Sequence, residues 1–299
     1  MPETHSSTSG APETAAPEDS TKRWSWHSDQ PPPYKDDAPM YHDAKNTQNT
    51  ISSQASTPLQ GDFSPSVQLQ IRAIGYNLNT ACSAPLHEQI TVHSPDDGAL
   101  KYTSVRPKRK SNSCALVYGA NTDGTPCIST IYRWGPGRPP KMRIFPKDSG
   151  TTVEAAIESN DELCEVVEVS NRRLFSRTQV LKTSFGNYEW RFGSRQECEE
   201  AFGANSLLIM EKIDSTGSLN LSKKRIRIAQ LVRNDEYRSE GTNKNHGGNG
   251  GRLMMDLRNW ADEKTRTASD MEEFIVAGCI CMLKREADRM IDNAIAAIT

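Results

Sequence analysis

The sequence predicts a mainly β protein, in which a closed antiparallel barrel of about twelve strands encloses a hydrophobic C-terminal helix behind a disordered N-terminal tail. Short segments of alternating polarity follow one another from about residue 65 onward. A ten-residue run without a charge, Phe274 to Leu283, lies close to the end of the chain. Residues 1–64, in contrast, contain scarcely a Val, Ile or Leu.

The N-terminal 64 residues are dominated by Ser, Thr, Pro, Asp, Glu and Gln, and they lower the hydrophobic content of the whole chain to 35%. Such a segment cannot bury enough apolar surface to offset the entropy lost when its backbone is ordered. We therefore expect a disordered tail over 1–64 and one folded domain over 65–299.

The strands are predicted from polarity that alternates with a period of two. In the first, Val67, Leu69 and Ile71 alternate with polar residues, and the turn sequence Pro95–Gly98 separates two of the later ones. The alternation slips between Ile228 and Ala229, which a β-bulge would explain. The predicted strands span 67–73, 86–93, 99–105, 114–119, 126–133, 141–145, 151–157, 163–169, 173–181, 187–192, 205–213, 223–233 and 252–258.

One short helix is predicted within this series. Ser194 and Glu197 have the spacing of a capping box, in which side chain and backbone of both residues satisfy each other's free amides. Gly203 is well placed to end this helix.

The second predicted helix is C-terminal, with a capping box at Ser269 and Glu272. Its apolar run is too short for a bilayer crossing, which needs about 20 residues, so it is interpreted as a buried core helix. After Leu283 the pattern becomes amphipathic. A helix that is apolar on every side fits the lumen of a closed barrel better than a sandwich. The alternative is an unrelated all-β domain with the helix docked outside.

Four segments in a fixed order carry a family resemblance. They are the strand Tyr188–Arg191, the pair Ile228–Ala229, the strand Gly251–Leu253 and the helix Phe274–Glu286. In this order and spacing the chain resembles the tubby-like superfamily, which includes phospholipid scramblases, LURP-one-related proteins and many fungal members. The resemblance covers 65–299 and implies a twelve-stranded barrel around a central C-terminal helix.

No catalytic, metal or cofactor site is predicted. The six histidines show no HxxxH or HExxH spacing, and the chain has no GxSxG motif. The glycine-rich stretch Gly241–Gly251 lacks the Lys-Ser/Thr of a phosphate loop and is interpreted as a flexible hairpin connection. Scramblases carry an acidic calcium loop before the helix, but Trp260–Asp270 does not alternate acidic ligands as calcium sites do.

The tail contains a PPxY motif formed by Pro31, Pro32, Pro33 and Tyr34. Its polyproline II conformation is preformed and suits the aromatic groove of a WW domain, with Tyr34 in an adjoining pocket. Scramblases, which this chain resembles, carry similar Pro-rich tails. A WW-domain protein such as a HECT-type ubiquitin ligase is the predicted partner, and a plain linker is the alternative.

One stretch of the chain is strongly basic, although the net charge of the whole chain is −2. Between Lys101 and Lys147 the chain has ten Lys or Arg and one acid, Asp123. Such a stripe attracts anionic lipid headgroups or nucleic acid. The candidate lipid-binding residues are Lys108, Arg109, Lys110, Arg138, Lys141 and Arg143. The alternatives are a solvated surface and a nuclear role, since 106–110 is typical of an import signal and 137–139 is similar to an AT-hook core that lacks its first arginine.

These patterns favour a non-enzymatic intracellular adaptor that binds anionic phospholipid through its barrel and WW-domain proteins through its tail. A scramblase-like lipid-handling protein and a nuclear, chromatin-associated factor that uses 101–147 are the alternatives. Seven scattered cysteines and a polar N-terminus without a secretory signal predict reduced thiols and a cytoplasmic location, peripheral at membranes.

Overall fold

The computed structural model of the chain describes residues 63–77, 89–106, 112–120, 125–132, 139–147, 149–158, 164–173, 176–214, 224–261 and 266–297. Residues 1–62 of the predicted tail, with the PPxY motif, lie outside these residues, whereas Phe63 and Ser64, which the prediction also gave to the tail, contact the barrel: the backbone amide of Ser64 donates to Asp256 at 3.3 Å. Four of the six candidate lipid-binding residues also lie outside the described residues, namely Lys108, Arg109, Lys110 and Arg138.

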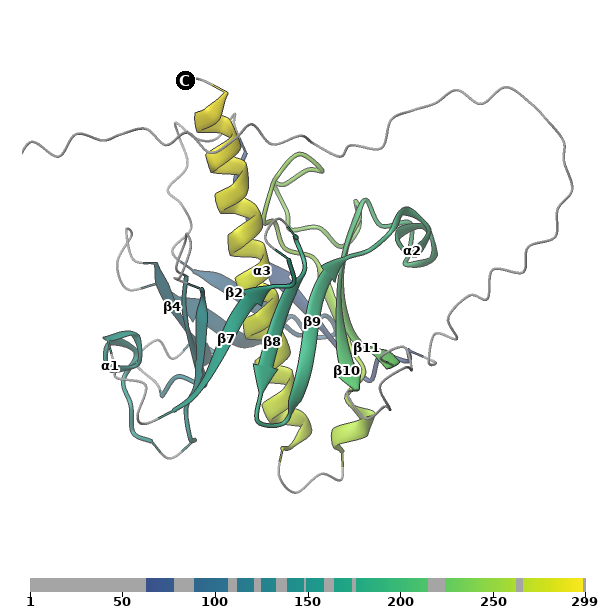
Figure 1. The fold of residues 1–299 in the computed structure, drawn as a ribbon. Coiled ribbons are helices and arrows are strands. Elements are labelled where there is room, and N and C mark those ends of the chain that lie inside the picture. Colours follow the sequence, from purple (N-terminus) through teal and green to yellow (C-terminus); the bar gives the residue numbers. More distant parts are fainter. Residues whose placement is uncertain are drawn as a thin grey trace, which may run out of the picture. The chain divides into compact units, whose positions relative to one another are not determined.

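Twelve antiparallel strands form a closed barrel, as the sequence predicts (Figure 1). Each strand pairs with the next along the chain, and β12 pairs with β1 to close the sheet, with Leu69 opposite Leu253. Closure leaves no free sheet edge. The strands are β1 (Val67–Arg72), β2 (Ile90–His93), β3 (Leu100–Val105), β4 (Ser113–Tyr118), β5 (Ile128–Ile131), β6 (Lys141–Ile144), β7 (Glu165–Asn171), β8 (Gln179–Thr183), β9 (Gly186–Phe192), β10 (Ser206–Asp214), β11 (Lys224–Arg233) and β12 (Arg252–Met255).

The C-terminal helix α3 (Ala268–Ala296) runs through the barrel (Figure 1). Its residues Phe274, Ile275, Ile280 and Leu283 are 1%, 0%, 2% and 1% exposed, which confirms that the helix is buried on all sides in its first half. They pack against the inward-facing side chains of the strands in one hydrophobic core. Each such side chain stabilises the fold by roughly 1.5–3 kcal/mol relative to exposure.

Two details of α3 concern its contact with the barrel wall and its N-terminal cap. A Cβ atom at Gly278 would lie 2.7 Å from Nε1 of Trp190, so glycine lets the helix approach the β9 wall closely. The capping box is formed by Thr267 and Asp270, so the predicted pair Ser269 and Glu272 is wrong. The two Ser/Thr-x-x-acid patterns overlap in sequence, and only the true first turn decides between them.

The bulge predicted in β11 is confirmed, since the pairing with β10 passes from Ala229 directly to Arg227 and leaves Ile228 unpaired.

The predicted strand 151–157 is wrong. It forms the helix α1 (Val153–Glu158), which buries Val153 and Ala156 against the outer face of β4 and β5. Six residues with mixed apolar spacing do not distinguish the two periodicities.

The helix α2 (Arg195–Glu200) has the predicted capping box of Ser194 and Glu197, and Gly203 lies just beyond its end with φ +59°. The stretch 241–251 connects the antiparallel pair β11 and β12, which confirms the predicted hairpin connection, but its second half is packed and not flexible as predicted. Residues 246–251 are buried, and a Cβ atom at Gly248 would lie 2.3 Å from the carbonyl oxygen of Leu283. The glycines therefore allow this loop to pack directly on α3.

Candidate anion-binding site

A pocket of about 640 Å³ lies beside the second half of α3. This half of the helix extends beyond the strands of the barrel (Figure 1). Four parts of the chain line the pocket: Asn77 after β1, the segment before β8 with the end of β9, the glycine-rich loop, and one face of α3. The α3 face consists of Glu286, Arg289, Met290 and Asn293, whose spacing of three and four residues places them on one side of a helix.

The pocket lining is basic. Arg177, Lys244 and Arg289 contribute three positive charges, and Glu286 is the one carboxylate among the lining residues that the structure describes. Arg177 and Lys244 are exposed, and the guanidinium carbon of Arg177 lies 5.9 Å from the centroid of the Phe192 ring. Phe192 and Met290 supply apolar surface to the lining.

The carboxylate of Glu286 is already neutralised by a buried arginine. Arg233, which is 2% exposed, donates from Nη1 and Nη2 to the two Glu286 oxygens at 2.6 and 3.2 Å. The backbone amide of Gly248 donates to the same carboxylate at 3.1 Å, and Nη2 of Arg233 also donates to Ser206. This network joins β11, the glycine-rich loop and α3, and it leaves the pocket with a net positive charge.

His246 forms part of the pocket wall and is buried. Burial lowers the pKa of its imidazole below the ordinary value of 6.5, so the ring is neutral at pH 7. The backbone amide of Asn243 donates to its Nδ1 at 3.1 Å. The positive charge of the pocket at neutral pH therefore comes from the arginines and the lysine.

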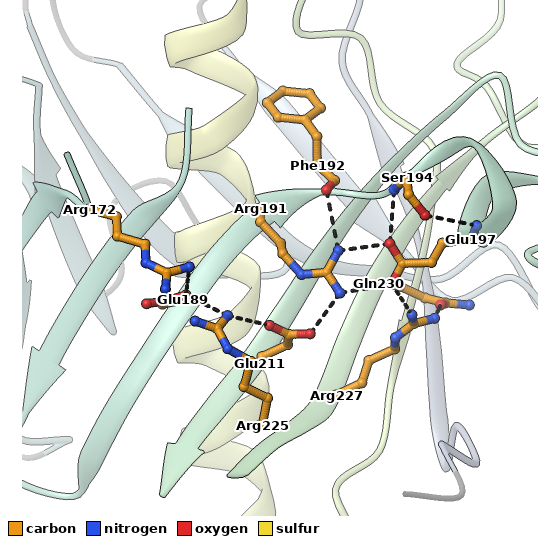
Figure 2. Close-up of polar contacts among 10 residues, drawn as sticks. All are labelled: Arg172, Glu189, Arg191, Phe192, Ser194, Glu197, Glu211, Arg225, Arg227 and Gln230. Carbon is orange, nitrogen blue, oxygen red and sulfur yellow. Dashed lines mark hydrogen bonds and ion pairs between the residues drawn. The ribbon is translucent and has the colours of Figure 1, made fainter. Parts of the chain in front are cut away.

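A second charged cluster covers the outer face of β9, β10 and β11 (Figure 2). Arg191 donates to both oxygens of Glu197, at 2.9 and 2.8 Å, and to Glu211 at 2.7 Å. Arg225 bridges Glu211 and Glu189, and Arg227 donates to Glu197 at 2.7 Å.

The carboxylates of this cluster occupy its guanidinium groups. Hydrogen bonds from Arg191 lower the pKa of Glu197 to about 2, although burial opposes the shift. Glu197 also caps α2, so the cluster fastens that helix to the sheet. Its charges are explained by the fold, and we do not assign a ligand to it.

The opposite end of the barrel, around the first turn of α3, is acidic. Glu273 is 5% exposed and accepts hydrogen bonds from the hydroxyls of Tyr118 and Ser269, while Glu272 accepts one from Tyr102 at 2.8 Å. Burial raises the pKa of Glu273 above its ordinary value of 4.5. Each of these carboxylates has a partner within the barrel mouth.

Of the predicted lipid-binding residues, two lie within the described part of the chain, and they differ. Lys141 is half-buried on β6. Arg143 is 6% exposed and lies under α1, where its Nη1 is 3.5 Å from the carbonyl oxygen of Ala156. Arg143 is therefore not presented to a membrane surface, contrary to what its role in lipid binding requires.

Arg177, Lys244 and Arg289 were not singled out by the sequence patterns as one site. Each is more than forty residues from the next along the chain, and only the fold brings them to one pocket.

Among the described residues, no group of three or more His, Cys, Asp or Glu is placed to hold a metal ion. None of the described helices has the length and apolar character needed to span a membrane.

A scan against protein-family models, a search of curated proteins and a search of solved structures each found no match. The resemblance to the tubby-like superfamily therefore stays a prediction from the order of the sequence segments.

Proposed function

We propose that this protein is a non-enzymatic adaptor of tubby-like type, whose barrel binds anionic phospholipid headgroups and whose tail recruits a WW-domain protein such as a HECT-type ubiquitin ligase. The observation that carries the lipid-binding part is the basic pocket at the end of α3. In this proposal the protein is cytoplasmic and associates peripherally with membranes.

The chemistry of the pocket suits a phosphorylated headgroup. Guanidinium groups such as those of Arg177 and Arg289 bind phosphate oxygens through paired, charge-assisted hydrogen bonds, and the ammonium of Lys244 adds a point charge. The pocket volume of about 640 Å³ falls within the usual range of small-ligand sites, roughly 300–1,000 Å³. The chain as a whole carries a net charge of −2, so the attraction is local to this end of the barrel.

Vesicle co-sedimentation tests the proposal. The full chain should bind vesicles of phosphatidylcholine that contain phosphatidylserine or phosphorylated phosphatidylinositol, and not phosphatidylcholine alone. Binding should fall steeply as salt is raised, since exposed charges are screened. The double variant Arg177→Glu with Lys244→Glu should lose binding, because both side chains are exposed at the pocket.

The matched control reverses two exposed lysines elsewhere on the barrel, Lys182 of β8 and Lys224 of β11. This variant changes the net charge equally and should keep binding. Equal loss in both variants would reduce the effect to overall charge and contradict a role for the pocket. The variant with Lys108, Arg109 and Lys110 changed to Glu measures the separate contribution of the basic stretch, and a mobility-shift assay with duplex DNA tests the nuclear alternative.

The tail is tested separately, because its motif Pro31–Tyr34 needs no contribution from the barrel. Tyr34→Ala should remove binding to immobilised WW domains, since the tyrosine ring fills its own pocket. The wild-type affinity is expected near ~10–100 μM, as for a short peptide from a flexible segment. Equal retention of wild type and Tyr34→Ala would contradict the adaptor role.

A further inference from the structure

Phe202 is an exposed aromatic residue in a strained backbone conformation. Its side chain is 58% exposed, and its φ of +58° is the one positive value for a residue other than glycine among the described residues. The left-handed region is unfavourable for a bulky side chain, and helix ends that enter it usually place glycine there. Here Phe202 follows α2 immediately before Gly203, so the strain is tolerated although glycine would relieve it.

The surrounding residues hold Phe202 in this position. The side-chain amide of Asn234 donates to the Phe202 carbonyl at 3.1 Å, and the ring meets Tyr237 edge-on with centroids 5.9 Å apart. The ring of Tyr237 is covered in turn by the guanidinium of Arg252 at 4.7 Å. The result is an aromatic knob on a fixed support, which is the character of a residue that anchors an interface.

The rim of this knob is acidic. Glu199 and Glu200 precede it at the end of α2, and Asp235 and Glu236 lie in the turn that follows Asn234; all four are exposed. Arg195 and Arg238 pair with Glu199 and Asp235, at 3.1 and 2.9 Å. With Arg252, which covers Tyr237, three guanidinium groups stand against four carboxylates, so the rim keeps a net negative charge. A negative rim disfavours an anionic membrane and favours a basic protein surface with an apolar hollow.

A surface of that kind is present on the same chain. The pocket at the end of α3 has a basic lining with Arg177 and Lys244 exposed, and Phe192 and Met290 supply its apolar surface. We propose that the protein self-associates, with Phe202 of one copy inserted into the α3 pocket of a second copy. The acidic rim of the first copy then faces the basic lining of the second.

This inference uses the same pocket as the proposed function but does not depend on lipid binding there. If both occur, an anionic headgroup and Phe202 compete for one site, so membrane binding would release the second copy. Self-association in the absence of lipid tests the contact alone. Failure to bind vesicles would contradict the lipid proposal and leave the self-association result unaffected.

Sedimentation equilibrium of the full chain, over roughly micromolar to hundred-micromolar concentrations typical of modest interfaces, measures the association. Wild type should be in a concentration-dependent equilibrium between monomer and a larger species. Two variants should each raise the dissociation constant about tenfold or more, as removal of an interface anchor does. The first is Phe202→Gly, and the second is the double variant Arg177→Glu with Lys244→Glu. A 1:1 mixture of the two variants should associate more than either alone, because one retains the pocket and the other the knob.

The Phe202→Gly variant also reports on the origin of the strain. Its melting temperature should equal or exceed that of wild type, since glycine adopts φ +58° freely. A lower melting temperature would show that the ring is needed for the fold and would overturn the proposal. A wild type that stays monomeric at the highest concentration, or variants that associate as wild type does, would overturn it as well.

Discussion

The two ends of α3 differ in how their charges are used. The first turn of α3 carries Asp270, as the helix dipole favours, whereas its last turn carries no basic residue, so the dipole does not account for the basic groups beside its second half. At the N-terminal end the carboxylates have partners in the barrel mouth, such as Lys147 for Asp270 at 2.9 Å. At the C-terminal end, Arg177 and Lys244 come from other parts of the chain and have no carboxylate partner among the described residues.

This difference separates structural charge from charge available to a ligand. Glu273 and Glu272 are held by tyrosine hydroxyls inside the mouth, so their presence is explained by the fold. Arg233 is likewise explained, because it neutralises Glu286. Basic groups that gather at a hollow without such partners are where an anionic ligand is expected.

The largest effect is expected from a variant that disrupts the hydrophobic core between the two ends of α3. Ile280→Asp would place an unpaired charge in the dry interior of the barrel, which costs several kcal/mol, a large part of the stability of a typical domain. The variant should be insoluble or unfolded by circular dichroism, whereas Ile280→Val should fold and lose only about 0.5–1.5 kcal/mol. A soluble Ile280→Asp protein that melts cooperatively would show that the helix does not lie inside the barrel.

A smaller effect is expected at the basic end. Arg233→Met leaves the Glu286 carboxylate uncompensated and should cost ~3 kcal/mol, at the lower end of the range for a broken buried pair because Glu286 is partly exposed. It should also weaken vesicle binding, since a negative charge then faces the pocket. Urea denaturation measures the change, and adding Glu286→Leu should recover much of the stability. If the double variant is no more stable than Arg233→Met alone, the pairing does not explain the loss.

The smallest effect is expected at the acidic end, where it depends on pH. Burial raises the pKa of Glu273 in the folded state, so the ionised carboxylate makes folding less favourable. The protein therefore loses stability as the pH rises from about 4.5 through the folded pKa of this group. Glu273→Gln should therefore be as stable as wild type near pH 4 and more stable at pH 7. Thermal melts at both values measure this. A variant that is less stable than wild type at pH 7 would show that the charged form is needed in the hydrogen bonds from Tyr118 and Ser269.

Much of the fold was predictable because polarity with a period of two is a local signal. It locates eleven of the twelve strands to within a few residues, and β8 (Gln179–Thr183) was placed too early, at 173–181. The capping of α3 by Thr267 and the helical state of α1 were missed because short, overlapping patterns do not decide between alternatives. The run Phe274–Leu283 predicted an enclosed helix because an element that is apolar on every side must be surrounded.

The candidate site was less predictable, since it depends on tertiary contacts. Nothing near Lys244 indicates that its loop packs on α3, and the burial of Arg143 depends on α1, which was taken for a strand. The one local signal was the spacing of Glu286, Arg289 and Asn293 along a helix face. Counting basic residues along the chain led instead to 101–147, where Arg143 is covered and Lys147 is paired with Asp270.

Amide hydrogen exchange of the full chain, with and without vesicles that contain anionic phospholipid, tests the contrast between the two ends most directly. Exchange should slow in the pocket segments 176–178, 242–247 and 284–293, and it should stay unchanged at the acidic end over 266–273 and at Lys147. Vesicle binding that protects the acidic end, or that leaves the pocket segments unprotected, would contradict the claim that the basic end of α3 is the ligand site.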